Sequence, residues 1–88
     1  MPHSLEEKKR VVTRLRRIKG QAEALERAVE AGSECAPILQ QLAAMRGAVH
    51  GLMADLLDGH VREVLSQQPA PSQQAVDETL ALLRSYLK

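Results

Sequence analysis

One cysteine and three histidines are the residues with which this chain could bind a transition metal or react with an electrophile. Cys35 opens a long apolar stretch, and His60 continues one of its apolar lines near the other end. With His3 they offer thiol and imidazole ligands for an incomplete metal site, which Cys35 and His60 could share only between antiparallel subunits. A stronger site needs another ligand one turn beyond His60, but that position is Val64, which cannot coordinate a metal. Alternatively, Cys35 is a small buried residue and His60 a satisfied interior or interface histidine.

A second pairing joins Cys35 to the N-terminus. If Met1 is removed, as is usual before a small residue, Pro2 presents a secondary amine. Cys35 lies at the predicted start of a helix, where the dipole and free N–H groups favour a negatively charged sulfur. The amine can condense with a one-carbon aldehyde to an iminium, and the thiolate can add to leave an N–CH2–S bridge. Because many chains begin Met-Pro, this pairing alone does not separate aldehyde chemistry from a structural cysteine.

The stretch from Cys35 to about Ser66 is predicted to be one long helix. Pro37 suits its first turn, and no further proline follows until Pro69. Apolar residues at alternating steps of four and three form one face: Ile38, Leu42, Met45, Val49, Leu52 and Leu56. Such a helix is about 42 Å long, and its apolar surface is too wide for one other helix to cover. The stretch therefore predicts an oligomer built along a shared central helix.

Two further helices are predicted to flank the central one. Ser4 and Glu7 form a capping-box pattern that opens a helix over 5–31. Its apolar seam consists of Val11, Leu15, Ile18, Ala22, Leu25 and Val29. Gly32 provides the stop, and the short connector after it predicts an antiparallel hairpin. After a breaker segment over 66–72, Ser72 can cap a third helix over 73–87. The expectation is an all-α, three-helix protomer in a single domain, 1–88.

The composition limits the class of protein. With one tyrosine and no Phe or Trp, the core must be aliphatic, which suits helices. A lone cysteine is typical of a reducing compartment, and neither a membrane-spanning run nor a signal-peptide core is visible. We therefore expect a cytoplasmic protein that does not insert into membranes. The absence of a convergent acid/base set and of a Gly-rich phosphate loop argues against an enzyme. Gly47 and Gly51, four apart, indicate a close approach of another helix.

The charge is distributed unevenly. The net charge is only +1, yet seven of the twelve basic residues lie within one acid-free segment: Lys8, Lys9, Arg10, Arg14, Arg16, Arg17 and Lys19. Five of them are expected to spread around the side of the first helix away from its apolar seam: Lys9, Arg10, Arg14, Arg16 and Arg17. A solvated helix face usually mixes signs, so this cluster favours a densely negative partner, and duplex DNA fits best. An anionic membrane fits less well, because the opposite face has no Trp or Phe.

Several stretches together resemble the CsoR/RcnR family of bacterial transcriptional repressors over nearly the full length. The matching stretches are 6–9, 14–21, 34–35, 38–48, 51–53 and 84–88. The resemblance implies a three-helix protomer, a dimer with a four-helix core, and a homotetramer (a dimer of dimers) that binds operator DNA until an inducer weakens the complex. It also implies DNA contacts for Arg14 and Arg17, and for Arg46 and Lys88, beside Lys9, Arg10 and Arg16 from the basic segment.

The effector residues distinguish branches within that family. Copper sensors carry a Cys–His–Cys set, of which Cys35 and His60 match the first two, whereas Val64 replaces the second cysteine. Nickel/cobalt sensors have a histidine at that last position and an N-terminal histidine, which His3 matches. The formaldehyde-responsive branch keeps Pro2 and Cys35 and lacks a ligand at position 64. The chain is similar to this branch, although relatives usually have Asn where it has His50, and its linker over 66–74 is shorter and richer in proline than in some of them.

The resemblance thus implies a repressor of a formaldehyde-detoxification operon, derepressed when formaldehyde links the Pro2 amine to Cys35 of a neighbouring subunit. No cofactor is required, and a transition metal would bind adventitiously. Two alternatives remain open. One is a nickel/cobalt-, zinc- or copper-responsive repressor of the same family that uses Cys35, His60 and His3. The other is a helical metal-binding or adaptor protein with no role on DNA.

Overall fold

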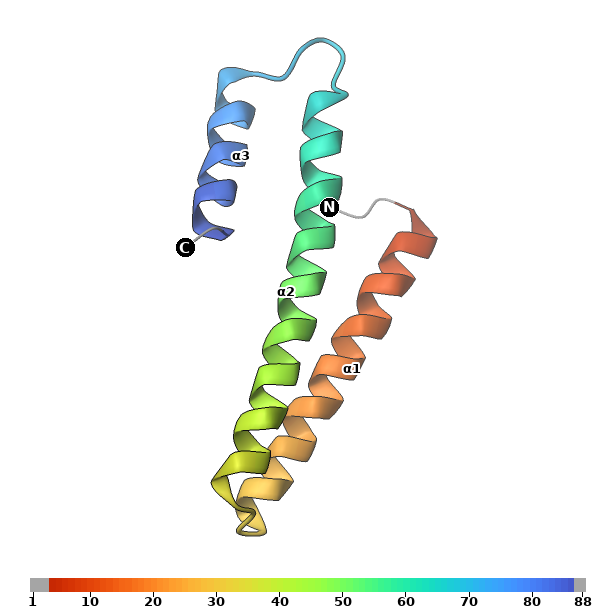
Figure 1. The fold of residues 1–88 in the computed structure, drawn as a ribbon. Coiled ribbons are helices and arrows are strands. Elements are labelled where there is room, and N and C mark those ends of the chain that lie inside the picture. The colour runs from red at the N-terminus through yellow and green to blue at the C-terminus, as the bar shows by residue number, and fades with distance from the viewer. Residues whose placement is uncertain (1–3, 87–88) are drawn as a thin grey trace. The chain divides into compact units, whose positions relative to one another are not determined.

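Three helices make up the part of the chain that the computed structural model describes, residues 4–86, and no strand occurs there. Helix α1 spans Leu5–Glu30, α2 spans Cys35–Leu65 and α3 spans Gln73–Tyr86 (Figure 1). The all-α, three-helix prediction is therefore confirmed. Three residues to which sequence assigned roles, Pro2, His3 and Lys88, lie outside the described residues. No described helix is long and apolar enough to cross a membrane.

Helix α1 begins where the capping box predicts. Ser4 has an extended backbone, with φ −80° and ψ 154°, and its Oγ accepts a hydrogen bond of 3.0 Å from the Glu7 N–H. This bond satisfies one of the N–H groups that a helix start leaves without a backbone partner. Glu6 and Glu7 also place negative charge in the first turn, where the helix dipole favours it. The basic segment is thus carried on a helix whose first turn is fixed.

Helix α1 ends at Glu30, one residue before the predicted end, because the chain turns around Gly32. Gly32 has φ +79°, a left-handed conformation that costs little without a Cβ atom. The N–H of Ser33 donates to the Ala28 carbonyl at 3.0 Å, and that of Gly32 to the Val29 carbonyl at 3.1 Å. This pair of bonds is a Schellman motif, which confirms Gly32 as the stop of the first helix.

The other helix boundaries also lie close to their predicted positions. Helix α2 ends at Leu65 rather than Ser66, whose N–H donates to the Arg62 carbonyl at 3.1 Å. Ser72 caps α3 as predicted, because its Oγ accepts a 3.1 Å hydrogen bond from the Ala75 N–H. The described part of α3 ends at Tyr86, and the last residue predicted for this helix lies beyond the described range.

The chain forms two compact units, and α2 contributes to both of them. In the first unit, which ends at Leu52, α1 and the first half of α2 form the predicted hairpin. Its inner face consists of partly or fully buried residues: Val11, Ile18, Leu25, Ile38, Met45, Ala48 and Leu52. Three residues of the predicted seam of α1, Leu15, Ala22 and Val29, are exposed in a single chain. Helix α2 covers only one side of α1, and these three residues lie at the edge of the covered side.

In the second unit, the last part of α2 and α3 enclose a smaller core. Val64 of α2 and Thr79 of α3 are buried there, with 6% and 8% of their surfaces exposed. Thr79 is a polar residue, but its Oγ1 donates a hydrogen bond of 2.9 Å to the Ala75 carbonyl within α3. The hydroxyl is therefore satisfied locally.

Candidate functional site

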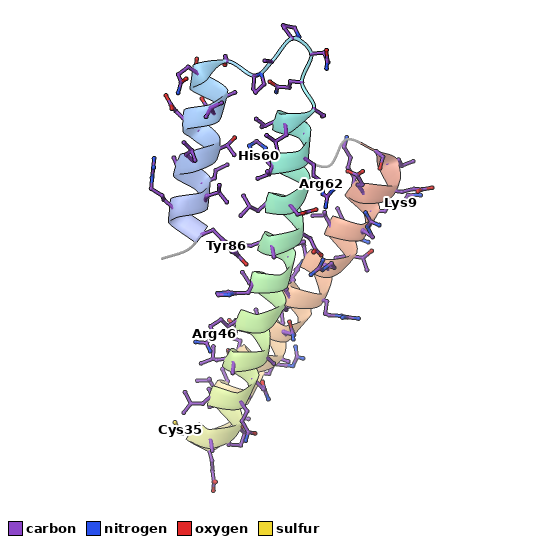
Figure 2. All side chains as sticks on the ribbon, turned by 45° about the horizontal axis from the view of Figure 1, so that its top comes forward. Lys9, Cys35, Arg46, His60, Arg62 and Tyr86 are labelled. Atoms are coloured by element: carbon purple, nitrogen blue, oxygen red, sulfur yellow. The ribbon has the colours of Figure 1, made fainter. Side chains whose placement is uncertain are left out.

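Cys35, the residue predicted to react with an effector, is the first residue of α2 and is a free, exposed thiol (Figure 2). The alternative interpretation, a small buried residue, is therefore wrong within one chain. Its position follows from the local sequence, since Gly32 ends α1 and Pro37 lies in the first turn of α2. Its proposed partner, Pro2, lies outside the described residues, so their pairing stays a prediction.

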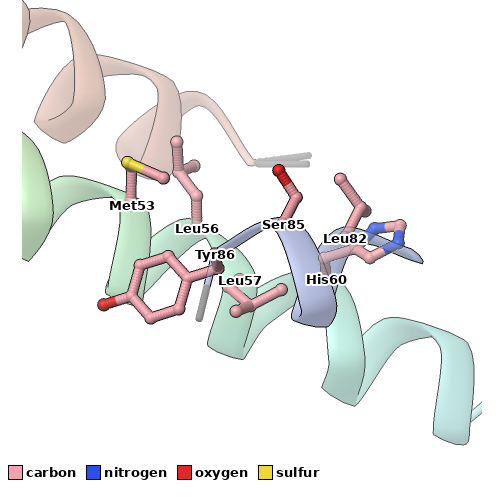
Figure 3. A pocket seen from close by; sticks show the side chains of 7 residues that line it. All are labelled: Met53, Leu56, Leu57, His60, Leu82, Ser85 and Tyr86. Atoms are coloured by element: carbon pink, nitrogen blue, oxygen red, sulfur yellow. The ribbon is translucent and has the colours of Figure 1, made fainter. Parts of the chain in front are cut away.

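His60 lies in the second unit, where it lines an apolar pocket of about 320 Å³ between α2 and α3 (Figure 3). The other lining residues are Met53, Leu56, Leu57, Leu82, Ser85 and Tyr86. The imidazole is half-buried, and the pocket offers it few other polar groups. This environment is closer to that of an interior or interface histidine than to that of a preformed ligand set.

The residues predicted to bind a metal are not brought together within one chain. Cys35 and His60 lie near opposite ends of α2, more than about 35 Å apart at the rise of an α-helix. Among residues 4–86, no group of three or more His, Cys, Asp or Glu side chains could hold a metal ion. His3 lies outside that range. Val64, at the position where a further ligand is needed, is buried in the core of the second unit.

The basic residues of α1 form two rows with different surroundings. Lys9 and Arg16, seven residues apart, are exposed on the face away from α2, and Figure 2 shows Lys9 pointing outward. Arg10, Arg14 and Arg17 follow at steps of four and three, which puts them in a second row on one side of the helix. Arg10 and Arg17 are exposed, whereas Arg14 is half-buried. The prediction that all these residues lie away from the packed side is therefore wrong for Arg14.

Arg14 is half-buried because its side chain lies against α2 at Gly51. A Cβ atom built on Gly51 would lie 3.1 Å from Nη2 of Arg14, closer than an ordinary van der Waals contact. The same construction at Gly47, one turn earlier, meets nothing within 4 Å. The sequence indicated a close approach of a helix backbone at these glycines, but what approaches Gly51 is the guanidinium of a predicted DNA contact. The only sequence signal for this contact was a glycine inside a long helix.

Arg46 belongs to neither row. It is exposed on α2 (Figure 2). Five positions separate it from Gly51, so at the turn of an α-helix the two point about 140° apart around the axis. Within one chain Arg46 therefore cannot extend the row that contains Arg14. It lies instead among the exposed apolar residues Leu42 and Val49 of the same helix. Its predicted contact with DNA depends on how copies of the chain assemble.

Comparison with known proteins now identifies the family. A model of the family described as metal-sensitive transcriptional repressors matches residues 7–85, which include all of α2. The chain belongs to the metal-sensitive transcriptional repressor family. The resemblance to the CsoR/RcnR repressors is thereby confirmed, as is the expectation that the protein is not an enzyme. As a transcriptional repressor of this family, the protein binds operator DNA.

Three relatives show how far the similarity extends. An uncharacterised protein from the bioA 5′ region of Serratia marcescens is 54% identical, over the whole of both chains. The transcriptional repressor RcnR of Salmonella arizonae is 39% identical, again over the whole of both. Among solved structures, a variant of the Formaldehyde-Responsive Regulator FrmR from Salmonella enterica serovar Typhimurium matches with a TM-score of 0.85 and 49% identity. That match covers 97% of this chain and 99% of the other.

Proposed function

We propose that this repressor responds to formaldehyde and controls a formaldehyde-detoxification operon. The observation that carries the proposal is the exposed free thiol of Cys35 at the start of α2, in a chain with proline at position 2. The similarity to a formaldehyde-responsive regulator at 49% identity supports the same effector. The chemistry uses only protein groups and formaldehyde, so the proposed repressor needs no cofactor.

The proposed reaction forms one bridge between two subunits. With Met1 removed, the secondary amine of Pro2 adds to the carbonyl carbon of formaldehyde, and loss of water leaves an iminium ion. The thiolate of Cys35 from a neighbouring subunit then adds to the iminium carbon. Nitrogen and sulfur end up joined through one methylene group. The net change is the uptake of one formaldehyde and the release of one water, with no oxidant or reductant.

The bridge would act on DNA binding through the arm that it holds. Only Met1–Ser4 separates the N-terminus from α1, and the basic segment starts within the second turn of that helix. Tying the arm to Cys35 of another subunit draws α1 away from the positions at which its cations meet the phosphates. A coupling of about 1–3 kcal/mol between effector and DNA changes the affinity roughly 5- to 150-fold.

The proposed assembly is a homotetramer, a dimer of dimers. The support is apolar surface that one chain leaves uncovered in its first unit, at Leu15, Val29, Leu39, Leu42 and Val49. Val29 is 56% and Leu39 58% exposed, which is high for aliphatic residues on packed helices. A shared α2 would cover this surface and repeat the basic α1 several times along the duplex.

A metal-responsive repressor is the second candidate. It is favoured by the 39% identity to RcnR and by the Cys35 and His60 side chains, which antiparallel subunits could bring together. Against it stands Val64, a buried aliphatic residue at the position where a further ligand is needed. Any metal bound by Cys35, His60 and His3 would therefore have an incomplete ligand set, and we propose that such binding is adventitious.

The test is fluorescence anisotropy on a labelled duplex from the region upstream of the gene. Protein is titrated alone, with formaldehyde, and in parallel with nickel, cobalt, zinc or copper ions. Release by formaldehyde at concentrations that leave a Cys35→Ala variant bound is the expected result. Release by metal alone moves the function to metal sensing, with His60 and His3 as the next residues to substitute. No binding to any duplex under low salt overturns the repressor assignment and leaves a helical adaptor protein.

A further inference from the structure

The contact between Arg14 and Gly51 links the basic helix to α2. Arg14 is the middle member of the row Arg10, Arg14 and Arg17, and it is the one that is half-buried. Its Nη2 would lie 3.1 Å from a Cβ atom at position 51. The guanidinium of this arginine therefore lies directly beside the space that the glycine leaves open.

We propose that Gly51 is a positioning residue for operator binding, which keeps the Arg14 guanidinium at a fixed place beside its two exposed neighbours. The inference rests on the proposed binding of DNA by α1. Arginine has a long side chain with many rotamers, and holding it before binding reduces the entropy lost when it meets a phosphate. A methyl group at position 51 would force the guanidinium to shift by a few tenths of an ångström.

The geometry also indicates what an alanine at position 51 would leave unchanged. The atom that a new Cβ would meet is the far end of a flexible side chain, and no backbone atom of α1 lies within 4 Å of it. The arginine can therefore move while the two helices keep their positions. Alanine is also a better helix former than glycine, so α2 itself is not weakened. An alanine at position 51 is therefore expected to change only the position of the Arg14 guanidinium.

Gly47→Ala is the matched control for Gly51→Ala. Both substitutions add one methyl group to the same helix, but a Cβ at position 47 meets nothing within 4 Å. Binding to the operator duplex is measured by anisotropy over a series of salt concentrations, and circular dichroism checks that helical content is equal. We expect Gly51→Ala to bind about 5-fold more weakly, with a salt slope that falls by less than about 0.9, the value for one fully lost phosphate contact. Gly47→Ala should match the wild type.

A double-mutant cycle tests whether Gly51 acts through Arg14. If it does, Gly51→Ala has no further effect on binding in an Arg14→Ala background. Arg14→Lys should also recover part of the salt slope in the Gly51→Ala background, because lysine lacks the branched guanidinium that the new methyl group meets. A merely structural defect at position 51 would weaken the Arg14→Ala protein as well and would not respond to lysine.

The outcomes separate this inference from the proposed function. If the wild type binds the duplex and Gly51→Ala binds as well as Gly47→Ala, positioning by Gly51 is overturned and the repressor function stands. An additive effect of the two substitutions overturns it in the same way. If the wild type binds no duplex, the proposed function itself is overturned, and the inference that rests on it is overturned with it. Loss of binding and of salt slope in Gly51→Ala alone, absent when Arg14 is alanine, supports the inference.

Discussion

Val64 follows His60 by one turn of α2, yet the two side chains have different environments. His60 is half-buried and lines the pocket between α2 and α3 (Figure 3), whereas Val64 is only 6% exposed in the core of the second unit. A ligand at position 64 would therefore have to replace an aliphatic side chain that the fold of a single chain already uses. Position 64, where metal sensors similar to this chain have a metal ligand, is therefore occupied here by a side chain of the core.

A Val64→His substitution should therefore have two opposing effects. Burying an imidazole in an aliphatic core is expected to lower the free energy of unfolding by about 1–3 kcal/mol. The new ligand, one turn from His60, should at the same time strengthen the response to nickel or cobalt. Thermal unfolding with and without metal measures both effects. Val64→Ala is the control, since it removes packing without adding a ligand; equal stabilisation of both variants by metal would contradict the role of position 64.

Formaldehyde should add the mass of one carbon atom to each protomer if the bridge joins Pro2 to Cys35. The gain is one carbon because the formaldehyde taken up is offset by the water released. Intact-protein mass spectrometry after brief exposure measures it, and non-reducing gel electrophoresis should show two chains held together. The Cys35→Ala variant should show neither the mass gain nor the linked chains. An unchanged wild-type mass, or the same mass gain in Cys35→Ala, would count against the proposed reaction.

Local patterns in the sequence predicted the fold closely, and the misses concern contacts between helices. The Ser4 cap, the Gly32 turn and the Ser72 cap each depend on residues within five positions, so they can be read from sequence. Burial is different, because an apolar periodicity marks a face without saying how much of it one neighbour covers. The split of the α1 seam at Leu15 and the half-burial of Arg14 at Gly51 both depend on how α2 packs.

The two basic rows of α1 should contribute unequally to operator binding. Replacing Arg10 and Arg17 with alanine removes the two exposed members of the row beside α2, while replacing Lys9 and Arg16 removes an equal charge from the opposite face. We expect the first pair to lower the salt slope by about 1.8, the value for two phosphate contacts, and the second pair to lower it less. Anisotropy titrations at several salt concentrations decide this. Equal slopes for both pairs would show that only the total charge matters.

The exposed apolar residues of the first unit should determine the oligomeric state. Leu42 and Val49 lie on one side of α2, seven residues apart, and both are exposed in a single chain. If α2 is shared between subunits, replacing both with glutamate buries two charges in the interface and should yield monomers or dimers in sedimentation velocity. Leu65→Glu is the control, since Leu65 ends the helix with 75% of its surface exposed and should leave the assembly unchanged. An intact tetramer in the double variant would place the interface elsewhere.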